Sequence, residues 1–130
     1  MAQFAAFIFV TPEYNHGIPG STKNAIDYLY NEVITKPAMI VSYGGHGGKH
    51  ASESLKTTLE GMKLRLVKTR PTLSFHGGQG PDMFSAAGTG ELGEDTRKDW
   101  EEDNQKEVLE GVTELEQLMK EEIILKKEGE

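Results

Sequence analysis

Two short segments carry residue types suited to holding a flat ligand. The first, residues 11–20, reads Thr-Pro-Glu-Tyr-Asn-His-Gly-Ile-Pro-Gly. Its prolines fix φ and its glycines permit close backbone approach, while Glu13, Tyr14 and Asn15 offer a carboxylate, an aromatic face and an amide. A heteroaromatic ring could stack on Tyr14 with its polar edge against Asn15. The same residues also suit an ordinary strand-to-helix turn, so composition leaves both interpretations open.

The second segment, residues 42–50, reads Ser-Tyr-Gly-Gly-His-Gly-Gly-Lys-His. Its glycines leave backbone N–H groups accessible, and a following helix N-terminus would add a positive dipole, which favours an anion or a polar ring edge. It is not a Walker loop, because Tyr43 stands where that motif needs its first glycine and His50 where it needs Ser or Thr. Hydrolysis of nucleoside triphosphates is therefore not expected.

The four histidines invite a metal site, since His46 and His50 are four apart and His16 and His76 are expected at the same sheet edge. However, His46 lies among glycines, and no carboxylate or thiolate completes a ligand set near this pair. The sequence predicts no metal site. No serine has a G-x-S-x-G context, so no catalytic side chain is expected, and Glu13 is expected to cap backbone donors rather than act as a base.

The elements that must position these loops alternate between strands and helices. Apolar runs bounded by Gly and Pro predict the strands, and apolar residues at steps of three and four predict the helices. The strands are expected at 4–10, 38–43, 64–67 and 72–75, the helices at 21–36, 52–61 and 96–126, and a long loop at 76–94. Ser21 or Thr22 is the expected first N-cap, and strand 4–10 reads as buried on both faces.

This order predicts parallel strands with right-handed helical crossovers, and hence a three-layer α/β sandwich with a parallel sheet. Ligands of such sheets bind at the carboxyl ends of the strands. Both candidate loops, and the chain from His76 onward, are expected at that edge.

Composition excludes several classes of protein. The 130 residues fit one domain, and the absence of cysteine excludes disulfides and thiolate sites and suits a cytoplasmic location. The longest apolar run, Phe4–Val10, is far shorter than the ~20 residues of a membrane span. A net charge of −7 argues against nucleic acid as a partner. Residues 91–130 hold 15 Asp and Glu against 6 Lys and Arg, which indicates a solvated acidic helix.

Taken together, the two loops and the residues around them resemble the NAD(P)H-dependent FMN reductase family, the flavodoxin-like flavoproteins that include quinone and azo-dye reductases. The motifs shared with the family are Thr11-Pro-Glu-Tyr-Asn15, Gly17-Ile-Pro-Gly20 and Lys23-Asn-Ala-Ile-Asp27. Lys36-Pro-Ala38 and Ser42-Tyr-Gly-Gly-His-Gly-Gly48 are similar to the fungal branch. The resemblance runs from about residue 7 to residue 62.

The resemblance implies a cofactor and a reaction. The implied FMN-binding residues are Pro12, Glu13, Tyr14 and Asn15 on one side of the flavin ring and Gly44, Gly45, His46 and Gly47 at its other edge. Hydride would pass from NAD(P)H through FMN to a quinone-type acceptor or free flavin, without a catalytic side chain, because the cofactor carries the chemistry.

Family members begin with a strand, a Gly-Ser-x-Arg phosphate loop, a helix and a second strand, all before the strand that starts here near Phe4. The chain is therefore expected to be N-terminally truncated and to keep strands 3, 4 and 5 of a flavodoxin-like sheet. Residues 1–95 would form the partial domain and 96–130 its acidic C-terminal helix. Loss of the phosphate cradle would weaken FMN binding by about 6 kcal/mol, or roughly ten-thousandfold.

The missing neighbour would also leave the first strand as an exposed apolar edge, which predicts either a partner strand, as in a homo-oligomer, or instability. The alternative function is thus a non-enzymatic, truncated flavodoxin-like module for interaction or oligomerisation.

Overall fold

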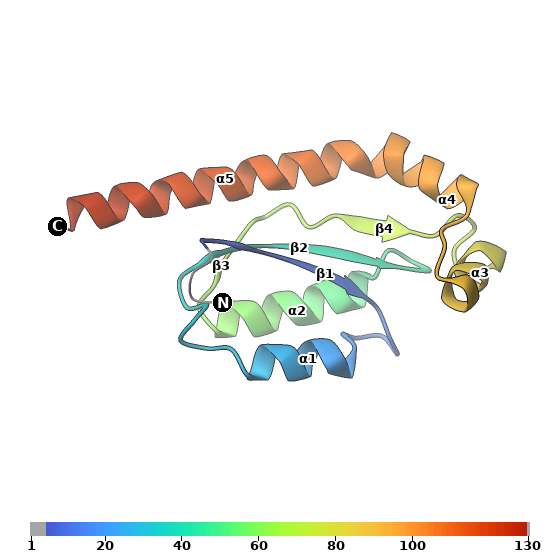
Figure 1. The fold of residues 1–130 in the computed structure, drawn as a ribbon, viewed down its shortest axis with the longest axis horizontal. Coiled ribbons are helices and arrows are strands. Elements are labelled where there is room, and N and C mark those ends of the chain that lie inside the picture. The colour runs from blue at the N-terminus through green and yellow to red at the C-terminus, as the bar shows by residue number, and fades with distance from the viewer. Residues whose placement is uncertain (1–4, 130) are drawn as a thin grey trace.

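Strand β2 (Pro37–Gly44) is the centre of a four-stranded parallel sheet in the computed structural model, which describes residues 5–129 (Figure 1). It pairs along its length with β1 (Phe7–Pro12), and along its other edge with β3 (Arg65–Leu66) and then β4 (Thr72–Ser74). The register places Phe9 opposite Ile40 and Val10 opposite Val41. The predicted parallel α/β sheet is confirmed.

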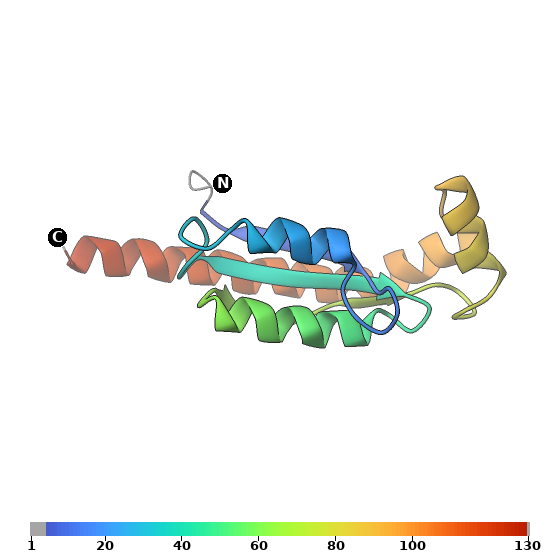
Figure 2. The same ribbon diagram turned by 90° about the horizontal axis from the view of Figure 1, so that it is seen from below.

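Helices cover the two faces of this sheet unequally. Helices α1 (Gly20–Asp27) and α2 (Lys49–Gly61) lie on one face, and α5 (Gln105–Glu128) lies along the other (Figures 1 and 2). Alternate residues of β2 feed the two cores. Ile40 joins Leu55 and Leu59 on the α2 side, whereas Met39 and Val41 join Leu115 on the α5 side. The result is the expected three-layer sandwich.

Gly111 lets α5 approach the sheet closely. A Cβ at this position would collide with the side chain of Met39, which is fully buried. A glycine in a helix interior costs about 1 kcal/mol relative to alanine. The close packing of α5 over β2 explains why a glycine stands at position 111 despite this cost.

The first strand differs from its prediction. It spans Phe7–Pro12 rather than 4–10, and Phe4 lies outside the described residues. It is not buried on both faces, since Ile8 is 51% and Val10 64% exposed. The reason is that β1 pairs only with β2 among residues 5–129, and α5 covers β2 rather than β1.

The helix boundaries also need correction. Helix α1 ends at Asp27 rather than at residue 36, because turns follow and Thr35 has φ of 68°, and its N-cap is Pro19 rather than Ser21 or Thr22. Helix α2 begins at Lys49, three residues before the expected start at Ser52. A side chain from outside the helix, described below, satisfies its first N–H groups.

The segment 76–94, expected to be a loop, contains helix α3 (Pro81–Thr89). Pro81 stands in its first turn and Gly90 ends it with a left-handed backbone, φ 76°, which is a common pair of helix boundary signals. The final helix has three parts, namely α4 (Glu94–Asp99), a π-helical turn at Trp100–Asn104, and α5. No helix in the described part of the chain is long and apolar enough to span a membrane.

Candidate functional site

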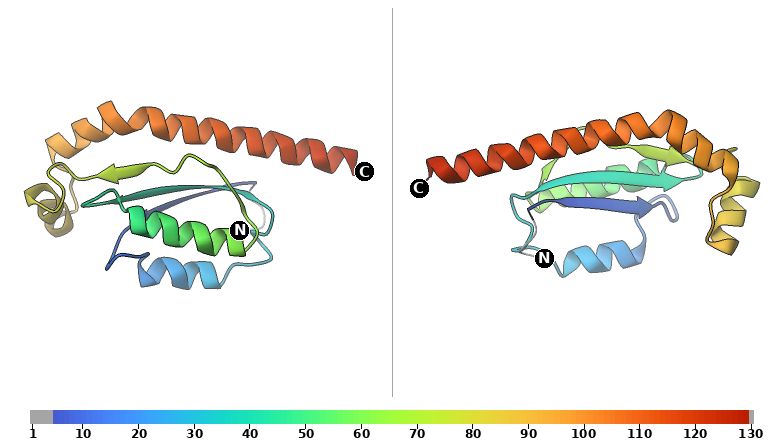
Figure 3. Two further views of the ribbon diagram at one scale, coloured as in Figure 1. Left: turned by 180° about the vertical axis from the view of Figure 1, so that it is seen from behind. Right: turned by 45° about the horizontal axis from the view of Figure 1, so that its top comes forward.

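The carboxyl ends of β1, β2 and β4 meet at the edge of the sheet that faces α3 (Figure 3). The loops that leave these strands, together with α3 and Trp100, enclose a cavity of about 670 Å³. This volume lies within the ~300–1,000 Å³ typical of small-molecule sites. The fold therefore brings both candidate loops to one cavity.

The first wall is the loop after β1, from which Pro12, Glu13, Tyr14, Asn15 and His16 line the cavity. The N–H of Tyr14 donates to the Gly17 carbonyl at 3.0 Å, and the N–H of Gly17 donates back to the Tyr14 carbonyl at 3.1 Å. Asn15 and His16 between them have φ of 51° and 64°, the backbone of a type I′ turn. This tight turn leaves Tyr14 61% exposed, with the residue lining the cavity.

Glu13 ties this loop to α2. Its Oε1 accepts hydrogen bonds from the N–H groups of His50, at 2.8 Å, and Ala51, at 3.2 Å. The carboxylate thereby caps the N-terminus of α2, as expected, and explains why the helix begins before Ser52. The structure places His16, rather than His46, beside His50, with the two ring centroids 5.5 Å apart.

The second wall is the glycine loop after β2, which contributes Tyr43, Gly44, Gly45 and His46. The backbone N–H groups of Gly45 and His46 have no hydrogen-bond partner among residues 5–129. Two unpaired donors thus stand at the rim of the cavity, available to acceptor atoms of a ligand. Burial, and then the nearby Tyr14 hydroxyl, raise the pKa of Tyr43, so this phenol stays neutral near neutral pH.

Gly47 differs from the other predicted site residues because it does not line the cavity. It is buried with φ of 78°, and a Cβ there would lie 2.9 Å from Cβ of Thr72 in β4. Ser42 Oγ also donates to the Gly47 carbonyl at 2.8 Å. Gly47 therefore packs the loop against β4, whereas the other seven predicted residues face the cavity.

The third wall comes from the chain at and beyond the end of β4, where the sequence predicted that residues from His76 onward would lie but singled out none of the aromatic residues. Phe75 and Trp100 pack against Tyr43, with ring centroids 5.8–6.4 Å apart, and Met83 and Phe84 of α3 also line the cavity. Trp100 is anchored by its Nε1–H, which donates to the Ser74 carbonyl at 2.8 Å. The single tryptophan of the chain, in a segment otherwise rich in charge, was the available signal for this wall.

A polar network fixes α3 to the following helix. Thr96, fully buried, donates from Oγ to Asp82 at 2.7 Å and accepts from the N–H of His76 at 3.0 Å. His76 Nδ1 also lies 2.7 Å from Asp99 Oδ2, and this hydrogen bond raises the pKa of His76. The network holds α3 against α4 beside the cavity.

Comparison with known proteins identifies the family of this chain. A protein-family model described as NADPH-dependent FMN reductase matches residues 1–78, more than half of the chain. The chain belongs to this family. The match to the FMN reductase family includes both loops and Phe75, whereas α3 and Trp100 lie beyond it.

Individual FMN reductases and related enzymes are similar to the chain. An NAD(P)H-dependent FMN reductase of Nectria sp is 46% identical over 122 residues, which are 92% of this chain and 60% of that protein. One from Saccharomyces cerevisiae is 52% identical over 60 residues, 46% of this chain and 31% of that protein. A quinone reductase of Pseudomonas putida is 45% identical over 56 residues, 35% of this chain and 30% of that protein. The chain thus spans three fifths or less of the length of these relatives.

Proposed function

We propose that the chain binds the ring of FMN in this cavity and serves an NAD(P)H-dependent FMN or quinone reductase reaction. The observation that carries the proposal is the convergence of the two family loops on one cavity with an exposed aromatic side chain and unpaired backbone donors. Tyr14 would stack against the ring, and the N–H groups of Gly45 and His46 would donate to its polar edge. FMN, when bound, supplies hydride transfer from NAD(P)H to the acceptor.

The rest of the cavity suits a flat acceptor. Tyr43, Phe75 and Trp100 give its third wall an aromatic surface, on which a quinone or a second flavin could stack. The resemblance to a protein named quinone reductase supports a quinone as the acceptor. We also propose that the chain forms a homo-oligomer and that it is located in the cytoplasm.

Flavin titration tests the binding half of this proposal. Flavin fluorescence is followed as the purified chain is added to FMN and, separately, to riboflavin, which lacks the phosphate. Because the proposed contacts are all to the ring, the two flavins are expected to bind with similar affinity. Tyr14→Ala is expected to weaken both by roughly tenfold, the loss of about 1.4 kcal/mol of stacking.

Tyr28→Ala is the matched control, because Tyr28 is 80% exposed at the end of α1 and does not line the cavity. It is expected to bind both flavins as the wild type does. Equal affinities of the Tyr14 and Tyr28 variants, or no binding at high micromolar flavin, would contradict the proposed site. NADPH oxidation with a quinone then tests turnover.

The exposed edge of β1 favours a second candidate function, a non-enzymatic interaction module. Ile8 and Val10 present apolar side chains on a strand whose outer edge has no partner among residues 5–129. A chain that self-associates but binds neither flavin would support this function over the first.

A further inference from the structure

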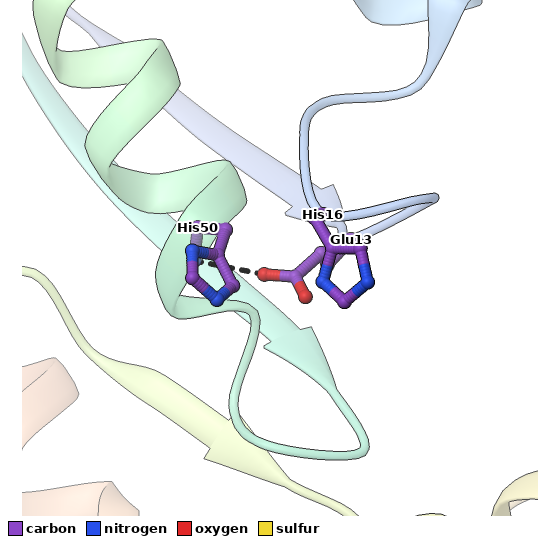
Figure 4. A group of neighbouring side chains, drawn as sticks. All are labelled: Glu13, His16 and His50. Atoms are coloured by element: carbon purple, nitrogen blue, oxygen red, sulfur yellow. Dashed lines mark hydrogen bonds between the residues drawn. The ribbon is translucent and has the colours of Figure 1, made fainter.

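Three side chains with metal-ligating atoms meet beside the cavity, which two of them, Glu13 and His16, also line. One carboxylate oxygen of Glu13, one ring nitrogen of His16 and one of His50 all lie within 4.8 Å of one another. Figure 4 shows the Glu13 carboxylate between the two imidazole rings. The three residues come from two segments, the loop after β1 and the first turn of α2.

Glu13 is held in an orientation that suits a metal ligand. Its Oε1 is fixed by the N–H groups of His50 and Ala51, so the direction of the whole carboxylate is set by the backbone of α2. No hydrogen bond to its other oxygen, Oε2, is found within the described part of the chain. The negative charge also offsets the positive end of the α2 dipole, which would otherwise repel a cation.

His16 reaches this position through a left-handed backbone. It is the second central residue of the turn at Tyr14–Gly17, with φ of 64°, a value that is uncommon outside glycine but that His, like Asn and Asp, adopts more often than other side chains. The turn directs the ring of His16 toward the ring of His50, and the two meet edge to face. Non-glycine residues in such conformations concentrate at binding sites, where contacts repay the strain.

We propose that Glu13, His16 and His50 form a binding site for a divalent transition-metal ion of the zinc class. Two imidazoles and one carboxylate are a ligand set of known zinc sites, with the fourth position left to water or another ligand. Tetrahedral bonds of ~2.0–2.1 Å bring ligand atoms roughly 3.3 Å apart, so the rings need only small rotations from their present positions. The side chains of His16 and His50 are both exposed, so their rings have room for these rotations.

The ion would join the loop after β1 to α2. Glu13 already links them by hydrogen bonds, and coordination by His16 and His50 would lock the turn that presents Tyr14 to the cavity. Mg²⁺ and Ca²⁺ do not suit the site, because these ions prefer oxygen ligands.

Co²⁺ titration of the tag-free chain tests the proposal, because Co²⁺ bound by nitrogen and oxygen in a low-coordinate site absorbs visible light. The wild type is expected to saturate at one equivalent, to lose the signal when Zn²⁺ is added, and to keep it when Mg²⁺ is added. His16→Asn, which retains a residue that tolerates positive φ, and His50→Gln are each expected to bind Co²⁺ at least about tenfold more weakly.

His46→Gln is the matched control, since His46 is an exposed histidine of the neighbouring loop outside the cluster. Its Co²⁺ affinity is expected to equal that of the wild type. Far-ultraviolet circular dichroism establishes that each variant is folded. A further variant, Glu13→Gln, lacks the anionic ligand but keeps an amide oxygen that can still cap α2. Absence of saturable Co²⁺ binding by the wild type, or equal affinity of the wild type, His16→Asn and His50→Gln, would overturn the proposal.

Discussion

Gly47 and Gly77 share a left-handed backbone, with φ of 78° and 74°, but their surroundings differ. A Cβ at residue 47 would press on Thr72, whereas a Cβ at residue 77 would meet nothing within 4 Å. Gly77→Ala is expected to lose about 1 kcal/mol of unfolding free energy to backbone strain, and Gly47→Ala about 2 kcal/mol or more, because it also displaces β4. Urea denaturation measures both, and equal losses would contradict the proposed role of Gly47.

The pair of His76 and Asp99 predicts a dependence of stability on pH. Asp99 raises the pKa of His76 in the folded state, assisted by Asp95 and Asp82, so the pair stabilises the fold below the unfolded pKa of about 6.5. The contribution is lost as the pH rises through the folded pKa. Asp99→Asn is therefore expected to lower the melting temperature at pH 5.5 and to leave it nearly unchanged at pH 8.5.

Asp103→Asn controls for this change of charge, because Asp103 is exposed and forms no ion pair with residues 5–129. It is expected to have little effect at either pH. A larger effect of Asp99→Asn at pH 8.5 than at pH 5.5 would show that the sign is wrong.

The positions and roles of single residues could be predicted where the type of side chain indicated the role. Tyr14 and Asn15 stand at the cavity as their loop suggested, and Glu13 caps backbone donors. The inward packing of Gly47 and the contact between His16 and His50 were not predictable, because both depend on which segment lies next to the loop in space. The sequence alone indicated no carboxylate to accompany His50, whereas the structure brings Glu13, 37 residues earlier in the chain, next to it.

Helix α5 is held on the sheet by one narrow stripe of side chains. Leu115 is 6% exposed between Met39 and Val67, whereas Leu109, on the same helix, is 57% exposed. Leu115→Ala is expected to cost about 2–4 kcal/mol of unfolding free energy through lost burial and the cavity left behind. Leu109→Ala is expected to cost less than about 0.5 kcal/mol. Denaturation of the two variants measures the contrast, and similar losses would mean that α5 is not docked as described.

Elements were predictable where apolar periodicity was strong. The strand at β2 stands close to its expected bounds, and the final helix expected at 96–126 is present as α4, a π-helical turn and α5, since both β2 and α5 have a strong apolar pattern. Helix α3 was missed because its sequence is rich in small residues and has no period, although Pro81 and Gly90 mark its two ends. The early end of α1 depends on turns after Asp27 that apolar spacing does not reveal.

At the scale of the whole molecule, the sandwich is lopsided, because α5 covers the middle of the sheet and leaves β1 bare on that side. Exposed apolar strand edges promote pairing between chains. We therefore expect the chain to self-associate with rising concentration, as measured by light scattering after size exclusion. Val10→Lys is expected to shift the chain toward the monomer, because a lysine on an edge strand opposes pairing.

Leu109→Lys tests whether any exposed apolar residue would have the same effect, since Leu109 is about as exposed as Val10 but lies on α5. It is expected to leave the association unchanged. A wild-type chain that stays monomeric, or equal effects of the two lysines, would refute pairing through β1.

The layer order and the end of the sheet where the cavity lies followed from the alternation of strands and helices. The position of Trp100 in the third wall did not, because this residue reaches Tyr43 and Phe75 from a π-helical turn that no apolar pattern indicates.

That wall also has a photophysical consequence. Trp100 is the only tryptophan among the 130 residues, and its indole stands at the cavity with its N–H bound to Ser74. Tryptophan emission from this chain therefore originates at the candidate site alone, while circular dichroism follows the fold as a whole. Because flavins absorb where indole emits, a flavin seated beside Trp100 would quench the protein's own fluorescence in proportion to its occupancy, without any added label.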